Sequence, residues 1–256
     1  MEQLLTQLRQ GYAWNVENLG YGLLGFHAVE YMLFELSNNG TKSTPHNINY
    51  APEELIYLCG VAEDLRNQCV YLEAAWAGMD NVSLLKQQIL EEAELKPSRN
   101  YGWMMLHAGS AGSTYKTYQE AAEELIQGCI DIADEVGNTK IGRPHMGVSE
   151  DDRNYIESPY SLNSTADFAG NIESVKNAYC GSNPGDASVS DFIKSVNPDL
   201  DRRLRKQIEI SLSAIKAIPE PFASSAKGDA AGQAVIVVGS ELVDILEDVM
   251  TELSKQ

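Results

Sequence analysis

Along most of the chain, apolar residues recur every three or four positions, which is the spacing of an amphipathic helix. The clearest example begins at Pro52, a residue suited to the first turn of a helix, and ends at Gly78. Its apolar stripe consists of Leu55, Ile56, Cys59, Ala62, Leu65, Cys69, Leu72 and Trp76. We therefore predict one long helix over this stretch.

The same spacing predicts seven more helices. We expect Ser83 to cap one of them, Gly137 to end another, and Pro219 with Pro221 to stop a third. Only residues 234–238 look like a strand, and this run is too short and isolated to indicate a sheet. The pattern predicts an all-α fold of two side-by-side helical bundles. The seven helices span residues 4–16, 21–36, 83–95, 113–136, 164–180, 200–215 and 229–253.

Two stretches interrupt this periodicity. Residues 96–112 mix small residues with large aromatic ones, which is typical of a linker that packs between two bodies. We therefore place a domain boundary here, with a first bundle over residues 1–97 and a second over residues 98–256. Residues 138–162 show no period and are predicted to form a long loop, a feature that is often functional.

Composition and charge limit the classes of function open to this chain. The 256 residues are 43% apolar, as in a globular protein, and their formal net charge is −18. Such a surface repels nucleic acids and favours cations or basic partners. The plain alternative is that the acidic surface only keeps the protein soluble. No apolar run reaches transmembrane length and no leader opens the chain, so we expect a cytosolic protein or one whose leader was removed. The four cysteines lack CxxC spacing, which excludes a zinc cluster and predicts buried free thiols.

The most polar feature of the apolar run at residues 21–36 is the set Gly25, His27 and Glu30. A helix places His27 and Glu30 on one face, where they can share a metal ion, share a proton or satisfy each other in a packed interior. Gly25 is a poor helix residue, and a glycine beside polar groups lets another backbone or a ligand approach closely. Because His-x-x-Glu alone is a weak signal, the motif needs support from the rest of the chain.

A second polar cluster covers residues 157–168. Glu157 and Asp167 offer acceptors or ligands, and Ser161 and Ser164 offer hydrogen-bond partners beside a helix N-terminus. Ser164 stands three residues before Asp167, as in a capping box, so an ordinary helix cap is the plain alternative. The serines have no base beside them in sequence, so nucleophilic catalysis is unsupported.

Familiar catalytic patterns are absent. The chain has no HExxH, no Glu-x-x-His pair, no G-x-S-x-G elbow, no Walker loop and no G-x-G-x-x-G. His27 and Glu30 supply two metal ligands, whereas catalytic zinc usually has three from the protein.

Together, the two polar segments resemble the imelysin family, also called M75 peptidases. That family is named for a GxHxxE motif, which Gly25, His27 and Glu30 match residue for residue. Residues 157–181 resemble its later block, which ends in an Asn-x-Tyr-x-Gly signature. This signature is formed here by Asn177, Tyr179 and Gly181.

The resemblance implies two related four-helix bundles, with the GxHxxE helix and the later block meeting at their interface. It also implies an exported cell-envelope protein, periplasmic or lipoprotein-anchored, associated with bacterial iron acquisition. Typical members have several helices before the motif, whereas 24 residues precede Gly25 here. The resemblance therefore implies a truncated or circularly permuted member, with the helix over residues 229–253 as the candidate for a moved piece.

We favour a binding protein of the envelope that holds iron, zinc or a small polar ligand at the domain interface. In this interpretation His27 and Glu30 are the metal ligands, and the other residues around the ligand are Gly25, Glu157, Ser161, Ser164 and Asp167. One alternative is a zinc-type metallopeptidase of family M75 that uses the same pair. Another is a hydrogen-bonded strut that fixes the two bundles together.

Overall fold

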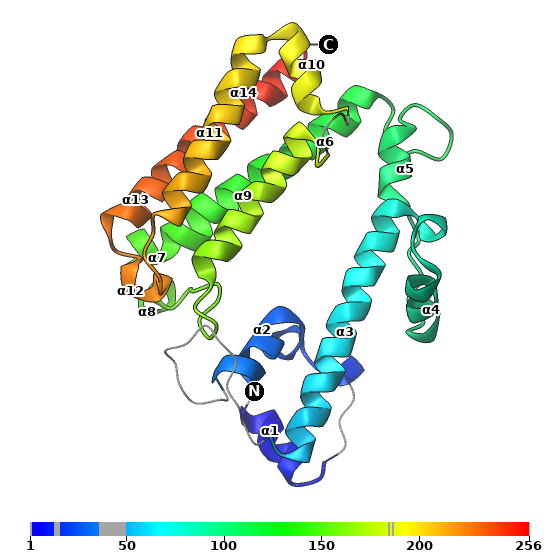
Figure 1. Cartoon of the computed structure of the whole chain (residues 1–256), viewed down its shortest axis with the longest axis vertical. Helices are drawn as coiled ribbons and strands as arrows, with labels where there is room; N and C mark the ends of the chain where they lie inside the picture. Colours follow the sequence, from blue (N-terminus) through cyan, green and yellow to red (C-terminus); the bar gives the residue numbers. More distant parts are fainter. Residues whose placement is uncertain (1, 13–15, 36–49, 184, 186, 256) are drawn as a thin grey trace. The chain divides into compact units, whose positions relative to one another are not determined.

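A computed structural model describes residues 2–12, 16–35, 50–183, 185 and 187–255. These ranges are mostly helical and contain no strand, which confirms the all-α prediction (Figure 1). None of the helices in them is long and apolar enough to cross a membrane. The chain divides into two compact units, residues 1–116 and 117–256, and each is described by itself.

The first unit is built along one long helix, α3 (Pro52–Ala77), which confirms the prediction for this stretch. The predicted cap of the following helix also forms, since the Ser83 Oγ accepts a hydrogen bond from the Lys86 N–H. The other helices are α1 (Glu2–Arg9), α2 (Gly25–Glu30), α4 (Leu84–Glu92) and α5 (Tyr101–Leu106), with a π-helical turn at Tyr31–Glu35 and 3₁₀ turns at Val16–Asn18, Tyr21–Leu23 and Met79–Asn81. Each helix predicted over residues 4–16 and 21–36 is therefore shorter than expected, and positions 13–15 and 36 lie outside the described residues.

The core of the first unit is small and divided. One cluster, near the motif, consists of Leu5, Leu8, Met32, Tyr57 and Val61, and the other consists of Val70, Ala74, Val82 and Leu90. The Tyr57 hydroxyl donates a 2.7 Å hydrogen bond to the Leu23 carbonyl, just before α2. Burial raises the pKa of Tyr57 to about 12, so this donor keeps its proton in alkaline solution as well as at physiological pH. The bond ties the motif segment to α3.

The apolar stripe predicted on α3 is largely exposed. Side chains on other faces of α3, including Tyr57, Val61 and Ala74, supply its contribution to the core instead. Cys59 and Cys69 are exposed as well, so the prediction of buried thiols is wrong for both and holds for Cys129. The reason is that α3 carries apolar residues on several faces, and periodicity alone does not tell which face a small core will cover.

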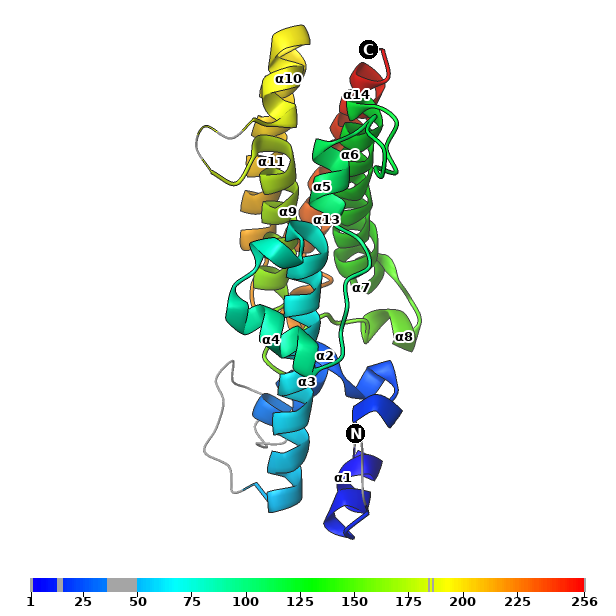
Figure 2. The ribbon, with the colours of Figure 1, turned by 90° about the vertical axis from the view of Figure 1, so that its right-hand side faces the viewer.

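Most of the second unit is a bundle of long helical rods, seen side by side in Figures 1 and 2. The rods are α6 (Tyr118–Asp134), α9 (Ser164–Cys180), α11 (Pro198–Lys216) and the run α13 (Asp229–Ile236), a π-helical turn (Val237–Leu242) and α14 (Val243–Leu253). Shorter elements are a π-helical turn at Glu135–Ile141, α7 (Gly142–Met146), α8 (Glu150–Arg153), α10 (Val189–Val196) and α12 (Phe222–Ser225). One continuous core runs through the bundle and includes the fully buried Phe168, Tyr179 and Phe222.

Gly137 does not end a helix, which corrects the prediction. The helical path continues through the π-helical turn and α7 to Met146, so residues 138–146 are not part of a loop. A Cβ atom built on Gly137 would lie 2.2 Å from the backbone nitrogen of Gly239, and the Asn138 amide donates a 2.9 Å hydrogen bond to the Gly239 carbonyl. This glycine therefore permits close contact between two π-helical turns.

The two units divide between Lys116 and Thr117, later than the expected boundary after residue 97. The stretch expected to be a linker contains α5, which packs on α3 within the first unit through Trp76 and Tyr101, whose ring centroids are 5.6 Å apart. Thr117 caps α6, since its Oγ1 accepts a 3.1 Å hydrogen bond from the Glu120 N–H.

Candidate functional site

The motif begins with a glycine that the backbone requires. Gly25 is the first residue of α2 and has φ +75°, a conformation that favours glycine because other residues are strained there. A Cβ atom at this position would meet nothing within 4 Å. The glycine is therefore needed for the turn into the helix. No described residue comes close to it, contrary to the expectation that it lets another backbone approach.

His27 and Glu30 contact each other on the next turn of α2. The distance from His27 Nδ1 to Glu30 Oε2 is 3.2 Å, so the helix does place both side chains on one face. The imidazole is 62% exposed, whereas the carboxylate is 10% exposed. The π-helical turn at Tyr31–Glu35 follows directly, and such turns are frequent at functional sites. The pair thus combines an accessible ring with a carboxylate held at the surface of the core.

This pair can engage a cation in two ways. If the Nδ1–H donates to the ionised Glu30, the lone pair on Nε2 is available as a ligand and the carboxylate orients the ring. If Nδ1 of His27 and Oε2 of Glu30 both bound one ion, the pair would supply one nitrogen and one oxygen ligand, which iron and zinc both accept. Both arrangements fit the donor set. Among the described residues, no group of three or more His, Cys, Asp or Glu side chains is placed to hold a metal.

The second polar segment is built around the N-terminus of α9. The Ser158 N–H donates a 3.1 Å hydrogen bond to the Ser164 Oγ, and the Ser158 hydroxyl donates to the Asp167 carboxylate. The predicted capping box of Ser164 and Asp167 does not form, because Ser164 is already the first helical residue and its hydroxyl turns back to Ser158. Ser161 lies half-buried in the same turn. At Leu162 the backbone has φ +60°, a strained conformation of the kind often found at functional sites.

The helix end has a partner that sequence reasoning missed. The Thr165 N–H donates a 2.9 Å hydrogen bond to the Glu220 carboxylate, whose other oxygen accepts from the Phe222 N–H at 2.8 Å. A carboxylate at this position stabilises a helix N-terminus. Glu220 lies 55 residues further along the chain, so no local pattern points to it.

Glu157 already has a cationic partner. Lys140 Nζ lies 2.9 Å from its Oε1 and also donates to Asn171 at 3.3 Å. Both side chains of the ion pair are half-buried. Lys140 comes from the π-helical turn at residues 135–141, so the ion pair ties the start of this segment to that turn.

The structure thus groups the predicted site residues into two sets. Gly25, His27 and Glu30 lie together on α2 in the first unit. The second set, in the second unit around the start of α9, consists of Glu157, Ser161, Ser164 and Asp167. The meeting of these sets at one interface stays a prediction.

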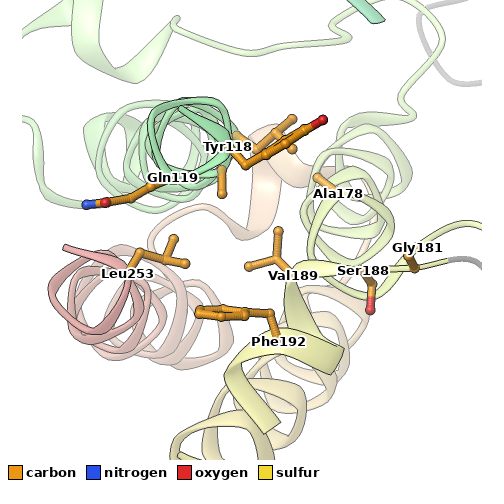
Figure 3. Close-up of a pocket in the computed structure, with 11 residues that line it drawn as sticks. Tyr118, Gln119, Ala178, Gly181, Ser188, Val189, Phe192 and Leu253 are labelled. Atoms are coloured by element: carbon orange, nitrogen blue, oxygen red, sulfur yellow. The ribbon is translucent and has the colours of Figure 1, made fainter. Parts of the chain in front are cut away.

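A separate apolar pocket of about 600 Å³ opens in the second unit, between α6, α9, α10 and α14. In Figure 3, Val189, Phe192 and Leu253 point into it, and Tyr118 lies along its rim. Gly181, the last residue of the Asn-x-Tyr-x-Gly signature, is part of its lining. The predicted ligand-binding and metal-binding residues do not line this pocket.

The described chain is thus an all-helical protein with the GxHxxE motif on α2 and the second polar segment at the start of α9. The chain belongs to the Imelysin family (Peptidase M75), whose profile matches residues 4–248. Membership in this family confirms the resemblance drawn from the two motifs.

Named relatives and solved structures are similar over much of this chain. It is 28% identical over 218 residues to "Iron-regulated protein A" of Synechococcus elongatus, covering 84% of this chain and about half (53%) of that relative's length. A putative iron-regulated protein A precursor from Parabacteroides distasonis is 26% identical, with a TM-score of 0.75 over 98% of this chain and 72% of that one. An imelysin peptidase from Bacteroides ovatus is 29% identical, with a TM-score of 0.59 over 75% of this chain and 51% of that one.

Proposed function

We propose that this protein is an envelope binding protein of bacterial iron uptake, and that His27 and Glu30 hold its ligand, a metal ion or a small polar molecule. The observation that carries the proposal is the contact of the exposed His27 ring with the nearly buried Glu30 carboxylate at 3.2 Å. An exposed imidazole fixed by a carboxylate is a common arrangement for a metal ligand. The name of two relatives, iron-regulated protein A, supports the link to iron.

The chemistry of the pair favours binding over catalysis. Iron and zinc both accept imidazole and carboxylate ligands, so the donor set fits either ion. With His27 and Glu30 as the protein's two ligands, the other coordination positions of an ion would be left to water or to a small molecule bound with it. Glu30, held at the surface of the core, would keep the ring of His27 in one orientation, which lowers the entropy lost on binding.

The α9 segment has a supporting role in this proposal. Its carboxylates, Glu157 and Asp167, are held in place by Lys140 and Ser158. The Ser158 N–H donates to the Ser164 Oγ and the Ser158 hydroxyl donates to Asp167, so this turn at the start of α9 has a fixed conformation that a polar ligand could contact. Placement of this turn beside His27 is part of the proposal.

The competing proposal is a zinc-type metallopeptidase. The family name and the name of the B. ovatus relative, an imelysin peptidase, favour it. Hydrolysis by zinc needs a third ligand, an open position and a base for the water proton. Turnover of an unfolded substrate such as reduced casein, abolished by His27→Ala and retained by His107→Ala, would support the peptidase over the binding protein.

Metal-dependent stabilisation tests the binding proposal. Purified protein is heated with and without Zn²⁺ or Fe²⁺, because a ligand at 100 times its Kd stabilises the folded state by about 2.7 kcal/mol. We expect the rise in Tm to disappear in His27→Ala and Glu30→Ala. It should persist in His107→Ala, which removes an exposed histidine that stacks on Trp103 outside the motif. No rise in the wild-type protein at excess metal would favour the strut.

A further inference from the structure

The apolar pocket of the second unit has the size of a small-molecule site. Its volume is about 600 Å³, and pockets that hold small molecules measure about 300–1,000 Å³. Its described lining comes from the second unit alone, so the pocket is complete within one compact body. In Figure 3, Val189 and Phe192 of α10 and Leu253 of α14 point into the space, and Ala178 of α9 faces them.

A buried hydrogen-bond network fixes the walls of this pocket. The Tyr179 hydroxyl of α9 donates a 3.0 Å hydrogen bond to the carboxylate of Asp201 on α11, which also accepts from the Ser190 hydroxyl of α10. Burial, and then the charge of Asp201, raise the pKa of Tyr179, so its hydroxyl remains a donor. The network joins three helices at the pocket. Such a preformed pocket binds a ligand with a smaller loss of entropy than one that must order first.

The Asn-x-Tyr-x-Gly signature builds one side of the pocket. Tyr179 is fully buried and anchors the end of α9 through the network. Gly181 follows the last helical residue with φ +81°, a conformation that favours glycine, and it lines the pocket. The proposed site at His27 and Glu30 makes no use of this signature, whereas the pocket depends on both of its residues.

The lining indicates an uncharged ligand. None of the described residues that line the pocket is charged. Two of the polar side chains already have partners, since the Gln119 amide donates to Glu123 at 2.9 Å and the Ser188 hydroxyl donates to Asp191 at 2.8 Å. A charged group placed among these walls would lose its hydration without gaining an ionic partner, which is costly.

A polar hollow adjoins the pocket at Gly181 and Ser188, which line both. The charged side chains in its described lining are Asp191 and Arg205, which are of opposite sign. Arg205 also donates a 3.2 Å hydrogen bond to the Ser190 hydroxyl, which is part of the network. A hydroxyl group both donates and accepts hydrogen bonds, so it suits a place that offers one acceptor and one donor.

We propose that the pocket between α6, α9, α10 and α14 binds an uncharged amphiphilic small molecule, of the class of long-chain alcohols. The apolar body of the molecule lies against Ala178, Val189 and Phe192. Its hydroxyl end lies at Ser188, at the edge of the polar hollow. This site is separate from His27 and Glu30, and its existence does not depend on the function proposed for that pair.

Two fluorescent probes that differ by one charged group test the site. N-Phenyl-1-naphthylamine is uncharged, whereas 1-anilinonaphthalene-8-sulfonate has the same rings and a sulfonate; both brighten in apolar surroundings. Titration into the full chain should give saturable binding of one uncharged probe per chain. The sulfonate should bind at least about tenfold more weakly, because its charge would be buried unpaired. Below micelle-forming concentrations, 1-decanol should displace the uncharged probe and decanoate should not.

Matched variants on α9 locate the probe. Ala178 and Ala166 are both exposed alanines of α9, but only Ala178 lines the pocket. Ala178→Phe fills the space and should weaken binding of the uncharged probe at least about tenfold, whereas Ala166→Phe should leave it unchanged. Phe192→Ala removes an apolar wall without adding bulk and should also weaken binding. Thermal unfolding of each variant verifies that the bundle is intact.

Three outcomes would overturn the proposal. The first is the absence of saturable binding of the uncharged probe. The second is equal binding in the wild-type protein, Ala178→Phe and Phe192→Ala, which would place the probe elsewhere. The third is binding of the sulfonate, or displacement by decanoate, as strong as that of the uncharged counterpart, which would refute the class of ligand.

Discussion

Two glycines on one helical path should respond oppositely to the same substitution. Gly128 lies inside α6, and a Cβ atom there would meet nothing within 4 Å. Gly128→Ala should therefore raise the free energy of unfolding by about 1 kcal/mol, the difference in helix propensity. At Gly137 the added carbon would lie 2.2 Å and 2.3 Å from the backbone N and Cα of Gly239.

The overlap at Gly137 exceeds 1 Å against ordinary non-bonded contact distances, and both opposing atoms belong to the backbone. Relief requires that the two π-helical turns move apart, which also strains the hydrogen bond from Asn138 to Gly239. Overpacking of a tight core costs about 1–3 kcal/mol, and here no side chain can rotate away. We expect Gly137→Ala to lower the free energy of unfolding by at least about 3 kcal/mol.

The assay must report on the second unit. The three tryptophans, Trp14, Trp76 and Trp103, all precede Thr117 in the sequence, where the second unit begins, so tryptophan fluorescence does not report on that unit. Hydrogen exchange of α14 amides, measured by mass spectrometry across a urea series, follows the second unit directly. A decrease in the free energy of unfolding of less than about 1 kcal/mol for Gly137→Ala would refute the close contact, and so would a change of the same sign in Gly128→Ala and Gly137→Ala.

Three further predictions concern single residues. Gly25→Ala should destabilise the start of α2 by about 1–2 kcal/mol because its φ is +75°, seen as faster hydrogen exchange over residues 25–35; unchanged exchange would contradict this reasoning. Glu220→Ala should cost about 1 kcal/mol through loss of the cap on α9, and equal urea midpoints would speak against that cap. The Ser149 hydroxyl and then Arg143 hold the pKa of Asp152 at about 2. Because this folded-state pKa is depressed, the contribution of Asp152 is present above about pH 4 and lost as pH falls toward 2. Asp152→Asn should therefore reduce Tm at pH 6 and have little effect at pH 2; an equal effect at both would rule out the linkage.

The local patterns predicted the helices and the motif well. The 3.6-residue period located α3, and Ser83 and Pro52 marked helix starts because caps and first turns depend on neighbouring residues alone. The contact of His27 with Glu30 follows from the same local geometry.

Features that depend on distant contacts were not predictable. Gly137 looked like a helix stop, since its contact with Gly239 joins residues about a hundred positions apart. The cap from Glu220 has the same origin. The exposed face of α3 was also missed. An apolar stripe indicates that burial of that face is favourable, but it does not identify the element that covers it.

Direct titration of metal into the protein tests the central claim, that His27 and Glu30 form a binding site. Isothermal titration with Zn²⁺, repeated anaerobically with Fe²⁺, should give one ion per chain in the wild-type protein and in the matched controls His107→Ala and Glu91→Gln. The same titration should show no binding in His27→Ala and at least tenfold weaker binding in Glu30→Gln. Binding that is unchanged in His27→Ala, or absent from the wild-type protein for both ions, would contradict a metal site at this pair.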